Sequence, residues 1–130
     1  MATEEKYFVF TLLNDGTYEI AAADVDDMPP KVEIPASHDG LPVTRIGDWA
    51  FSKRGGLVSV TIPDSVTSIG DCAFNICTGL ISIVVPSSVM SIGWGAFAGC
   101  SGLMSATIPA KINDIFSGCS NLTSITFIDK

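Results

Sequence analysis

The sequence predicts an α/β to mainly β fold, a solenoid of about four to five stacked coils with parallel strands and a β-hairpin at its N-terminal end. Three observations support it: a motif that recurs every 23 residues, a β-branched segment closed by proline in each repeat, and a run of 39 uncharged residues from Cys72 to Ala110. A fixed period of this length is typical of solenoids, because a single repeat is too small to bury its own apolar face and must stack on its neighbours.

The period is clearest in the segment Ile-Gly-x-x-Ala-Phe. It occurs at residues 46–51, 69–74 and 92–97, so both steps equal 23 residues. The Ile-Pro or Val-Pro pairs and the Gly-Leu pairs keep the same step, at Ile62-Pro63, Val85-Pro86 and Ile108-Pro109 and at Gly56-Leu57, Gly79-Leu80 and Gly102-Leu103. We therefore expect equivalent side chains of successive coils to lie over one another, with Phe51, Phe74 and Phe97 in one buried column.

Each coil begins with a strand-like segment. Residues 57–62 are rich in β-branched residues and read as a strand, with Leu57, Val60 and Ile62 expected to point inward, and Pro63 ends the strand because it cannot donate a hydrogen bond. Parallel stacking would place successive strands about 4.8 Å apart. The outward residues then form a surface that we call the Ser/Thr face, made of Ser59, Thr61, Ser82, Val84, Ser105, Thr107, Ser124 and Thr126.

A second extended piece follows in the same coil. Residues 65–69 and 88–92 are rich in Ser, Val and Ile and end at a glycine, after which a turn carries the Ala-Phe pair. The end coils depart from the period: about five residues are inserted at 37–42, and the stretch from Pro109 to Phe116 is four residues shorter than its counterpart. Terminal repeats of solenoids are commonly irregular because they also cap the stack.

Residues 1–30 lie outside the repeat and read as an N-terminal cap. Two strand-like runs, 7–13 and 17–22, flank Asn14-Asp15-Gly16, a turn composition typical of a β-hairpin. The sequence thus predicts a hairpin cap at residues 1–30 and a solenoid at residues 31–130, together forming a single structural domain.

The composition excludes several partners. Fourteen acids against seven bases give a net charge of −7, whereas nucleic-acid binding requires a basic patch. No stretch reaches about 18 apolar residues, so we expect no membrane insertion. The first residues carry Glu4 and Glu5 and lack the basic and apolar regions of a secretory signal, which predicts a cytosolic chain or one cut from a longer precursor.

The repeat resembles the BspA-like leucine-rich repeats. Residues 80–102 nearly spell out the pattern Leu-x-Ser-Ile-x-Ile-Pro-x-Ser-Val-x-Ser-Ile-Gly-x-x-Ala-Phe-x-x-Cys, and the likeness covers about residues 31–128. The resemblance implies a right-handed leucine-rich-repeat solenoid of the kind found in bacterial surface proteins and in some protists. It also implies adhesion or protein binding, with a host or extracellular-matrix protein as partner, and a cell-surface or secreted location.

The cysteines are interpreted as packing residues. Cys77, Cys100 and Cys119 each follow the Phe of their coil by three residues, which favours a ladder of buried thiols. A disulfide between stacked Cys77 and Cys100 remains open, because distance alone would allow it. Cys72 and Cys77 lack the spacing of a zinc site.

The remaining polar and aromatic candidates are also given structural interpretations. His38 lies beside Ser37 and Asp39, but no nucleophile elbow accompanies them, so a solvated loop histidine is predicted. Asp24, Asp26 and Asp27 lack the glycine and distal Glu of a calcium loop and read as a solvated acidic linker. Trp49 and Trp94 are predicted to pack near the turn, with partial exposure of one of them as the alternative.

Two functions are compatible with these features. The first is a non-catalytic protein-binding or adhesion module that uses the Ser/Thr face. The second is a structural unit that self-associates as a homo-oligomer through an open C-terminal strand, with Ile125 and Phe127 at the assembly edge. No paired acid and base or phosphate loop is found, so we expect no enzyme activity, no catalytic, metal or cofactor-binding residue, and no cofactor.

Overall fold

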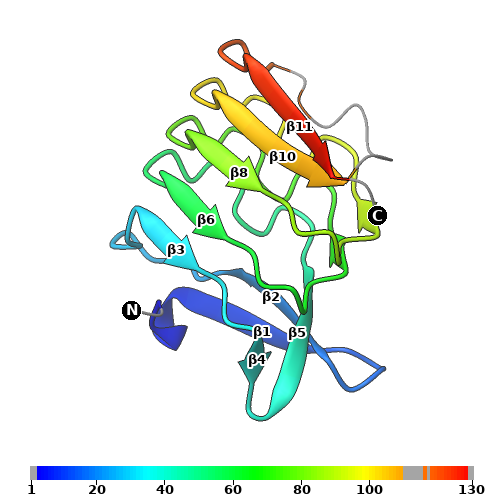
Figure 1. Cartoon of the computed structure of the whole chain (residues 1–130). Helices are drawn as coiled ribbons and strands as arrows, with labels where there is room; N and C mark the ends of the chain where they lie inside the picture. Colours follow the sequence, from blue (N-terminus) through cyan, green and yellow to red (C-terminus); the bar gives the residue numbers. More distant parts are fainter. Residues whose placement is uncertain (1–2, 110–115, 117, 129–130) are drawn as a thin grey trace.

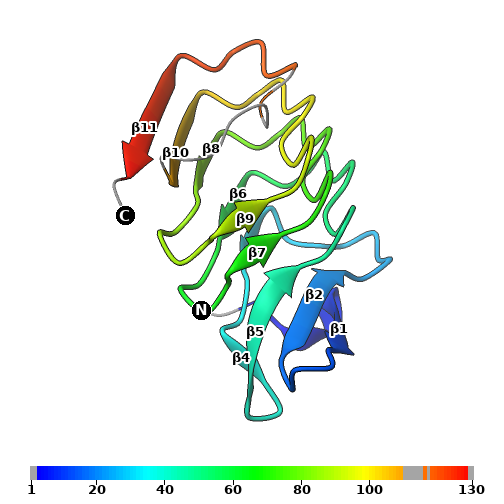
Figure 2. The same cartoon turned by 90° about the vertical axis from the view of Figure 1, so that its right-hand side faces the viewer.

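In the computed structural model, which describes residues 3–109, 116 and 118–128, the chain is a β-solenoid built on two sheets. Each of the first three coils runs from a strand of a five-stranded sheet to a strand of a six-stranded sheet and returns through a turn (Figures 1 and 2). Among the described residues the one helical segment is the 3-10 helix η1 (Glu5–Tyr7). The prediction of a mainly β solenoid with parallel strands is confirmed.

The five-stranded sheet is entirely parallel and lies along one side of the stack. Its strands, in spatial order, are β11 (Ser124–Ile128), β10 (Ser105–Pro109), β8 (Ser82–Val84), β6 (Ser59–Thr61) and β3 (Lys31–Glu33). The pairing of Thr61 with Val84 and of Ser105 with Ser82 follows the 23-residue step. Because strand pairing and repeat spacing coincide, the period in the sequence sets the register of the sheet.

The six-stranded sheet joins the N-terminal hairpin to the second strands of the coils. Its members are β1 (Phe8–Leu12), β2 (Tyr18–Ala22), β4 (Ser37–His38), β5 (Leu41–Ile46), β7 (Ser68–Ile69) and β9 (Ser91–Ile92). The hairpin strands β1 and β2 are antiparallel, and β2 then pairs in parallel with β5. The hairpin therefore continues the sheet of the coils at its N-terminal end, as Figure 2 shows.

The insertion at residues 37–42 forms a small hairpin of its own. Strand β4 pairs antiparallel with the start of β5, and the two residues between them, Asp39 and Gly40, have φ values of 50° and 80°. Two consecutive positive φ values are the geometry of the tight turns that match the twist of paired strands. The Asp-Gly pair explains why the extra residues fold back on themselves without disturbing the coil.

The core is a set of stacked columns, of which the phenylalanines form the largest. Phe51, Phe74 and Phe97 are fully buried, and their rings are nearly parallel with centroids 5.3 and 5.2 Å apart. Phe116 continues the column at 5.7 Å, and Phe8 of the hairpin meets Phe51 edge-on at 6.4 Å. The column expected from the sequence is confirmed, and it extends into the N-terminal hairpin.

The turns between the two sheets also stack, through hydrogen bonds from one coil to the next. The backbone N–H groups of Phe51 and Phe74 donate to the carbonyl oxygens of Ala73 and Ala96, both at 2.7 Å. Two positions of the turn have a positive φ. The first is occupied in successive coils by Trp49, Cys72 and Gly95. The second is occupied by Lys53, Ile76, Gly99 and Gly118. Glycine suits these positions, so the non-glycine residues are held there by the stacked turns.

The described part of the chain contains no helix with the length and apolar character that crossing a bilayer requires.

Candidate binding surface

The five-stranded sheet lies along one side of the solenoid (Figure 1), and the burial pattern of its strands places the Ser/Thr face on its outer side. The inward residues Leu57, Val60 and Ile62 are 2%, 7% and 7% exposed, as expected from the sequence. The parallel register sets the outward residues in two rows, Ser59, Ser82, Ser105 and Ser124 in one and Thr61, Val84, Thr107 and Thr126 in the other. Ser59, Ser105 and Thr107 are half-buried and the others are exposed. The eight residues are thus brought together on one surface.

Apolar side chains lie within and beside these rows, and charged residues lie at one edge of the sheet. Ile81, Val84 and Met104 are 48%, 59% and 54% exposed. Between Leu57 and Ala110 the sequence holds only two charged residues, Asp64 and Asp71, and neither lies on a strand of this sheet. Lys31 and Glu33 of β3 pair with Ser59 and Thr61 at the N-terminal edge. The surface is therefore broad, regular and uncharged apart from that edge.

The core side of the last strand is open. Ile125 and Phe127 of β11 pair with Ala106 and Ile108 of β10, which are only 3% and 1% exposed. Ile125 and Phe127 occupy the same inward positions, yet they are 43% and 57% exposed. The difference arises because β11 ends the sheet among the described residues, so no further described strand covers its inward side chains.

The cysteines form the thiol ladder that the sequence predicts. The thiols of Cys77, Cys100 and Cys119 donate to the carbonyl oxygens of Phe51, Phe74 and Phe97, at 3.0, 3.0 and 3.1 Å. Cys77 and Cys100 are fully buried, Cys119 is half-buried, and all four cysteines are free thiols. Each thiol thus satisfies a carbonyl group of the preceding coil, just beside the phenylalanine column.

The electrostatics of the ladder favour neutral thiols at its C-terminal end. The neighbouring Cys119 thiol favours the Cys100 thiolate, but the neighbouring Cys77 sulfur and burial outweigh it and raise the pKa of Cys100 to about 12. The neighbouring Cys100 sulfur, aided by burial, raises the pKa of Cys119 above its usual value. Neutral thiols are poor nucleophiles and poor metal ligands, and no metal-binding group of side chains occurs in the described ranges. Neutral thiols that donate to backbone carbonyls are suited to packing in the core.

His38 is not the solvated loop residue predicted from the sequence. Its ring stacks on Phe10 with centroids 3.8 Å apart and meets Tyr18 edge-on at 4.9 Å, and its side chain is only 19% exposed. Its Nδ1 atom lies 3.2 Å from a carboxylate oxygen of Glu5. The prediction was wrong because the inserted hairpin β4–β5 folds back over the aromatic side of the N-terminal hairpin. His38 is thus packed between the inserted hairpin and the aromatic side chains of the N-terminal hairpin.

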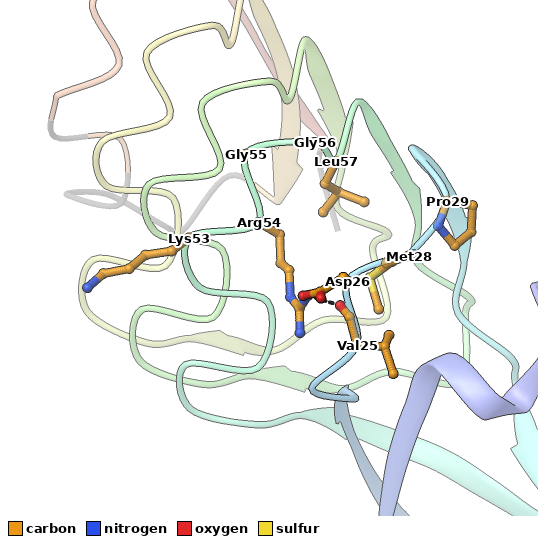
Figure 3. A pocket seen from close by; sticks show the side chains of 9 residues that line it. All are labelled: Val25, Asp26, Met28, Pro29, Lys53, Arg54, Gly55, Gly56 and Leu57. Carbon is orange, nitrogen blue, oxygen red and sulfur yellow. Dashed lines mark hydrogen bonds between the residues drawn. The ribbon is translucent and has the colours of Figure 1, made fainter.

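A pocket of about 220 Å³ lies between the acidic linker and the first turn (Figure 3). Arg54 reaches across it and donates to the carbonyl oxygens of Ala23 and Val25, which ties the linker to the solenoid. Asp26 lines the pocket, and Asp24 and Asp27 are exposed beside it in the chain. Because the guanidinium of Arg54 is already engaged by backbone carbonyls, the pocket serves as a joint between the hairpin cap and the first coil.

Both tryptophans are exposed, which corrects the prediction that they pack near the turn. Trp49 is 57% exposed and Trp94 is 75% exposed.

Asp48 and Asp71, which were not singled out from the sequence, form a ladder between the coils. Their carboxylates accept the backbone N–H of the residue one coil further on, at 2.8 and 2.9 Å. The 23-residue spacing of these two acids was the available sign of a stacked aspartate ladder.

The matches to known proteins agree with this architecture. A family model described as "BspA type Leucine rich repeat region" matches residues 32–130 in six copies. The structure of a leucine-rich repeat protein from Bacteroides capillosus is 31% identical, with a TM-score of 0.86, and the match covers 98% of this chain and 99% of the other. No curated protein matches the sequence significantly.

Two further solved structures belong to longer chains. A leucine-rich cell surface protein from Faecalibacterium prausnitzii is 30% identical with a TM-score of 0.71, and the match covers 98% of this chain but 43% of that one. A leucine-rich repeat protein from Eubacterium ventriosum is 26% identical with a TM-score of 0.70, and the match covers 94% and 33%. The chain therefore corresponds to less than half of each of these proteins.

Proposed function

The chain belongs to the family of BspA-type leucine-rich repeats, and on that premise we propose that it is a non-catalytic protein-binding module that holds its partner on the Ser/Thr face. Repeats of this type generally mediate protein interaction. The observation that carries the proposal is the surface itself, which is a row of paired parallel strands with exposed hydroxyl and apolar side chains and no charge beyond β3.

The physical properties of the Ser/Thr face define the partner. Interface centres are poor in charged groups, so an uncharged surface loses little solvation when it is covered. The strands are fixed by the stacked core, which limits the conformational entropy lost on binding. Exposed Ile81, Val84 and Met104 supply the apolar contacts, and the hydroxyl groups between them supply hydrogen bonds. The partner is a protein with a weakly charged, partly apolar surface.

The proposed setting is adhesion at a cell surface. BspA-type repeat proteins are often surface-associated, and the matched protein from Faecalibacterium prausnitzii is named a cell surface protein. We propose a host or extracellular-matrix protein as partner and a cell-surface or secreted location for this chain. These assignments follow from the family and extend the binding proposal.

Arginine substitutions on the Ser/Thr face test this function. The immobilised chain is exposed to solubilised extracellular matrix, retained proteins are identified by mass spectrometry, and the affinity of the most enriched one is measured. We expect the double variant Ser82→Arg/Ser105→Arg to weaken that affinity at least about tenfold, because two buried charges would cost about 1.4 kcal/mol or more. Both residues face outward, so the variant should keep its fold and its circular dichroism spectrum.

Thr67→Arg is the matched control. Thr67 is exposed just before β7 of the six-stranded sheet, and its substitution adds one arginine charge away from the Ser/Thr face. The control should bind within about twofold of the parent chain. Equal affinities for the parent and the folded double variant would rule out this face as the binding site.

Self-association through β11 is a second candidate function, favoured by the exposure of Ile125 and Phe127. The other edge strand of the sheet, β3, is protected: Lys31 and Glu33 are charged, and the backbone N–H of Glu33 donates to the hydroxyl of Thr3 at 2.8 Å. Exposed strand edges without such protection are templates for pairing. Because the two edges differ, two copies would pair β11 with β11 around a two-fold axis.

Light scattering tests the assembly proposal. We expect the chain to show a concentration-dependent dimer, and Phe127→Lys to shift the dissociation constant upward by at least about tenfold, because it places a charge in an apolar contact. Val84→Lys is the control: Val84 is 59% exposed, close to the 57% of Phe127, but lies on the outer face. A parent chain that stays monomeric at millimolar concentration would refute the assembly function.

A further inference from the structure

Two exposed tryptophans flank one aspartate in the turns that follow β5, β7 and β9, the strands that lie side by side in Figure 2. The N–H of Trp49 donates to the carbonyl oxygen of Asp71 at 2.9 Å, from the preceding coil. The N–H of Trp94 donates to the carboxylate of Asp71 at 2.9 Å, from the following coil. Asp71 is therefore bonded to both tryptophan backbones, one on each side. We call Trp49, Asp71 and Trp94 the acidic-aromatic patch.

The charge of Asp71 is uncompensated, in contrast to that of its repeat mate. Asp48 makes the same backbone hydrogen bond, but its carboxylate also accepts from Arg45 at 3.0 Å, and Arg45 is bound to Glu19 as well. Asp71 has no ion pair in the described part of the chain. The coil that follows brings no basic residue, because the sequence has none between Arg54 and Lys111, and Arg45 of the preceding coil is bonded to Glu19 and Asp48. Asp71 therefore contributes a negative charge that pairs with no basic side chain among the described residues.

The aromatic side chains of the patch have no packing role that would explain them. Trp94 occupies the repeat position of Asp48 and Asp71, where a carboxylate completes the ladder, yet its indole is 75% exposed. Trp49 is 57% exposed. Met90, which lies just before β9 in the same coil as Trp94, is 85% exposed. Large exposed aromatic and methionine side chains are enriched at binding sites and are costly to leave in water.

We propose that the acidic-aromatic patch binds a lysine- or arginine-bearing segment of a protein partner. An ammonium or guanidinium group can lie over an indole face while a carboxylate within reach neutralises it, and the two attractions reinforce each other. The net charge of −7 adds long-range attraction for a basic segment and repels acidic ones. The patch lies in the turns that follow β5, β7 and β9, outside the five-stranded sheet that carries the Ser/Thr face, so the inference goes beyond the proposed function and stands or falls separately from it.

Nuclear magnetic resonance titration of the whole chain tests the inference. The probe is a blocked hexapeptide that contains two arginines, and the reference is the same peptide with both arginines replaced by glutamine. We expect the arginine peptide to shift the indole N–H resonances of Trp49 and Trp94 with a weak dissociation constant, and the shifts to shrink several-fold as salt rises from about 20 to 500 mM. The glutamine peptide should bind at least about threefold more weakly.

Three variants locate the binding. Trp94→Ala should weaken the affinity for the arginine peptide about two- to fivefold, the range of an exposed cation–π contact. Asp71→Asn keeps the oxygen that accepts the Trp94 N–H but removes the charge. It should weaken the affinity for the arginine peptide by a similar factor. Asp48→Asn, the repeat mate paired with Arg45, should have the smaller effect. Equal binding of both peptides, or equal effects of Asp48→Asn and Asp71→Asn, would overturn the inference.

Discussion

Phe74→Ala is expected to lower the free energy of unfolding by about 4 kcal/mol, within the range of about 3–5 kcal/mol typical of large-to-small changes at fully buried aromatic positions. Phe74 is fully buried and stacks between Phe51 and Phe97 at 5.3 and 5.2 Å. Its removal takes away both ring contacts and leaves a cavity in the middle of the column. Because coils are stabilised only by their neighbours, a break in the middle should also lower cooperativity.

Urea denaturation followed by circular dichroism measures this effect. The midpoint should fall sharply, and the slope of the free energy against urea should decrease if the two halves of the solenoid unfold separately. Phe127→Ala is the control, since Phe127 is 57% exposed and should cost less than about 1 kcal/mol. If Phe74→Ala and Phe127→Ala were equally costly, the column would not be the main source of stability.

Gly70→Ala is expected to destabilise the chain by about 3 kcal/mol, at the upper end of the usual cost of overpacking. A Cβ atom at residue 70 would lie 2.3 Å from the carboxylate of Asp48, 2.6 Å from the backbone nitrogen of Asp48 and 2.7 Å from the carbonyl carbon of Gly47. Two of these three contacts are with backbone atoms of the preceding coil, so the coils would have to move apart. Gly93 has the same environment one coil later, against Asp71 and Gly70.

Two comparisons isolate the cause of this cost. Gly56→Ala adds the same methyl group where no atom lies within 4 Å, and it should change the free energy of unfolding by less than about 1 kcal/mol. Asp48→Ala combined with Gly70→Ala removes the carboxylate contact but keeps the backbone contact, so the double variant should remain destabilised. Full recovery in the double variant would show that the side chain, and not the close approach of two coils, requires glycine.

The repeated positions were predictable, and the unrepeated ones were not. Phe51, Phe74 and Phe97 recur at equal spacing, so their common environment follows from stacking alone, as does the outward direction of Ser82 and Ser105. His38 occurs once, in an insertion, and its burial depends on where the hairpin strand with Phe10 lies. No local pattern predicts such a contact between segments that are distant in the sequence.

The candidate sites divide in the same way. The sequence located the Ser/Thr face by alternation and period, because parallel strands spaced by one repeat must align equivalent side chains. It could not show that Trp49 and Trp94 are exposed, since periodicity does not distinguish a turn residue that packs inward from one that faces solvent. It also could not show that Arg45 neutralises Asp48 and not Asp71.

The sequence by itself determined the coil, its 23-residue register and the buried columns, because every repeat imposes the same pattern and the patterns satisfy one another only when stacked. The tertiary structure alone decided how the hairpin joins the stack, through the pairing of β2 with β5, and which charges and aromatic rings are left without a partner. Those outcomes depend on contacts that occur once, between segments that no repeat relates.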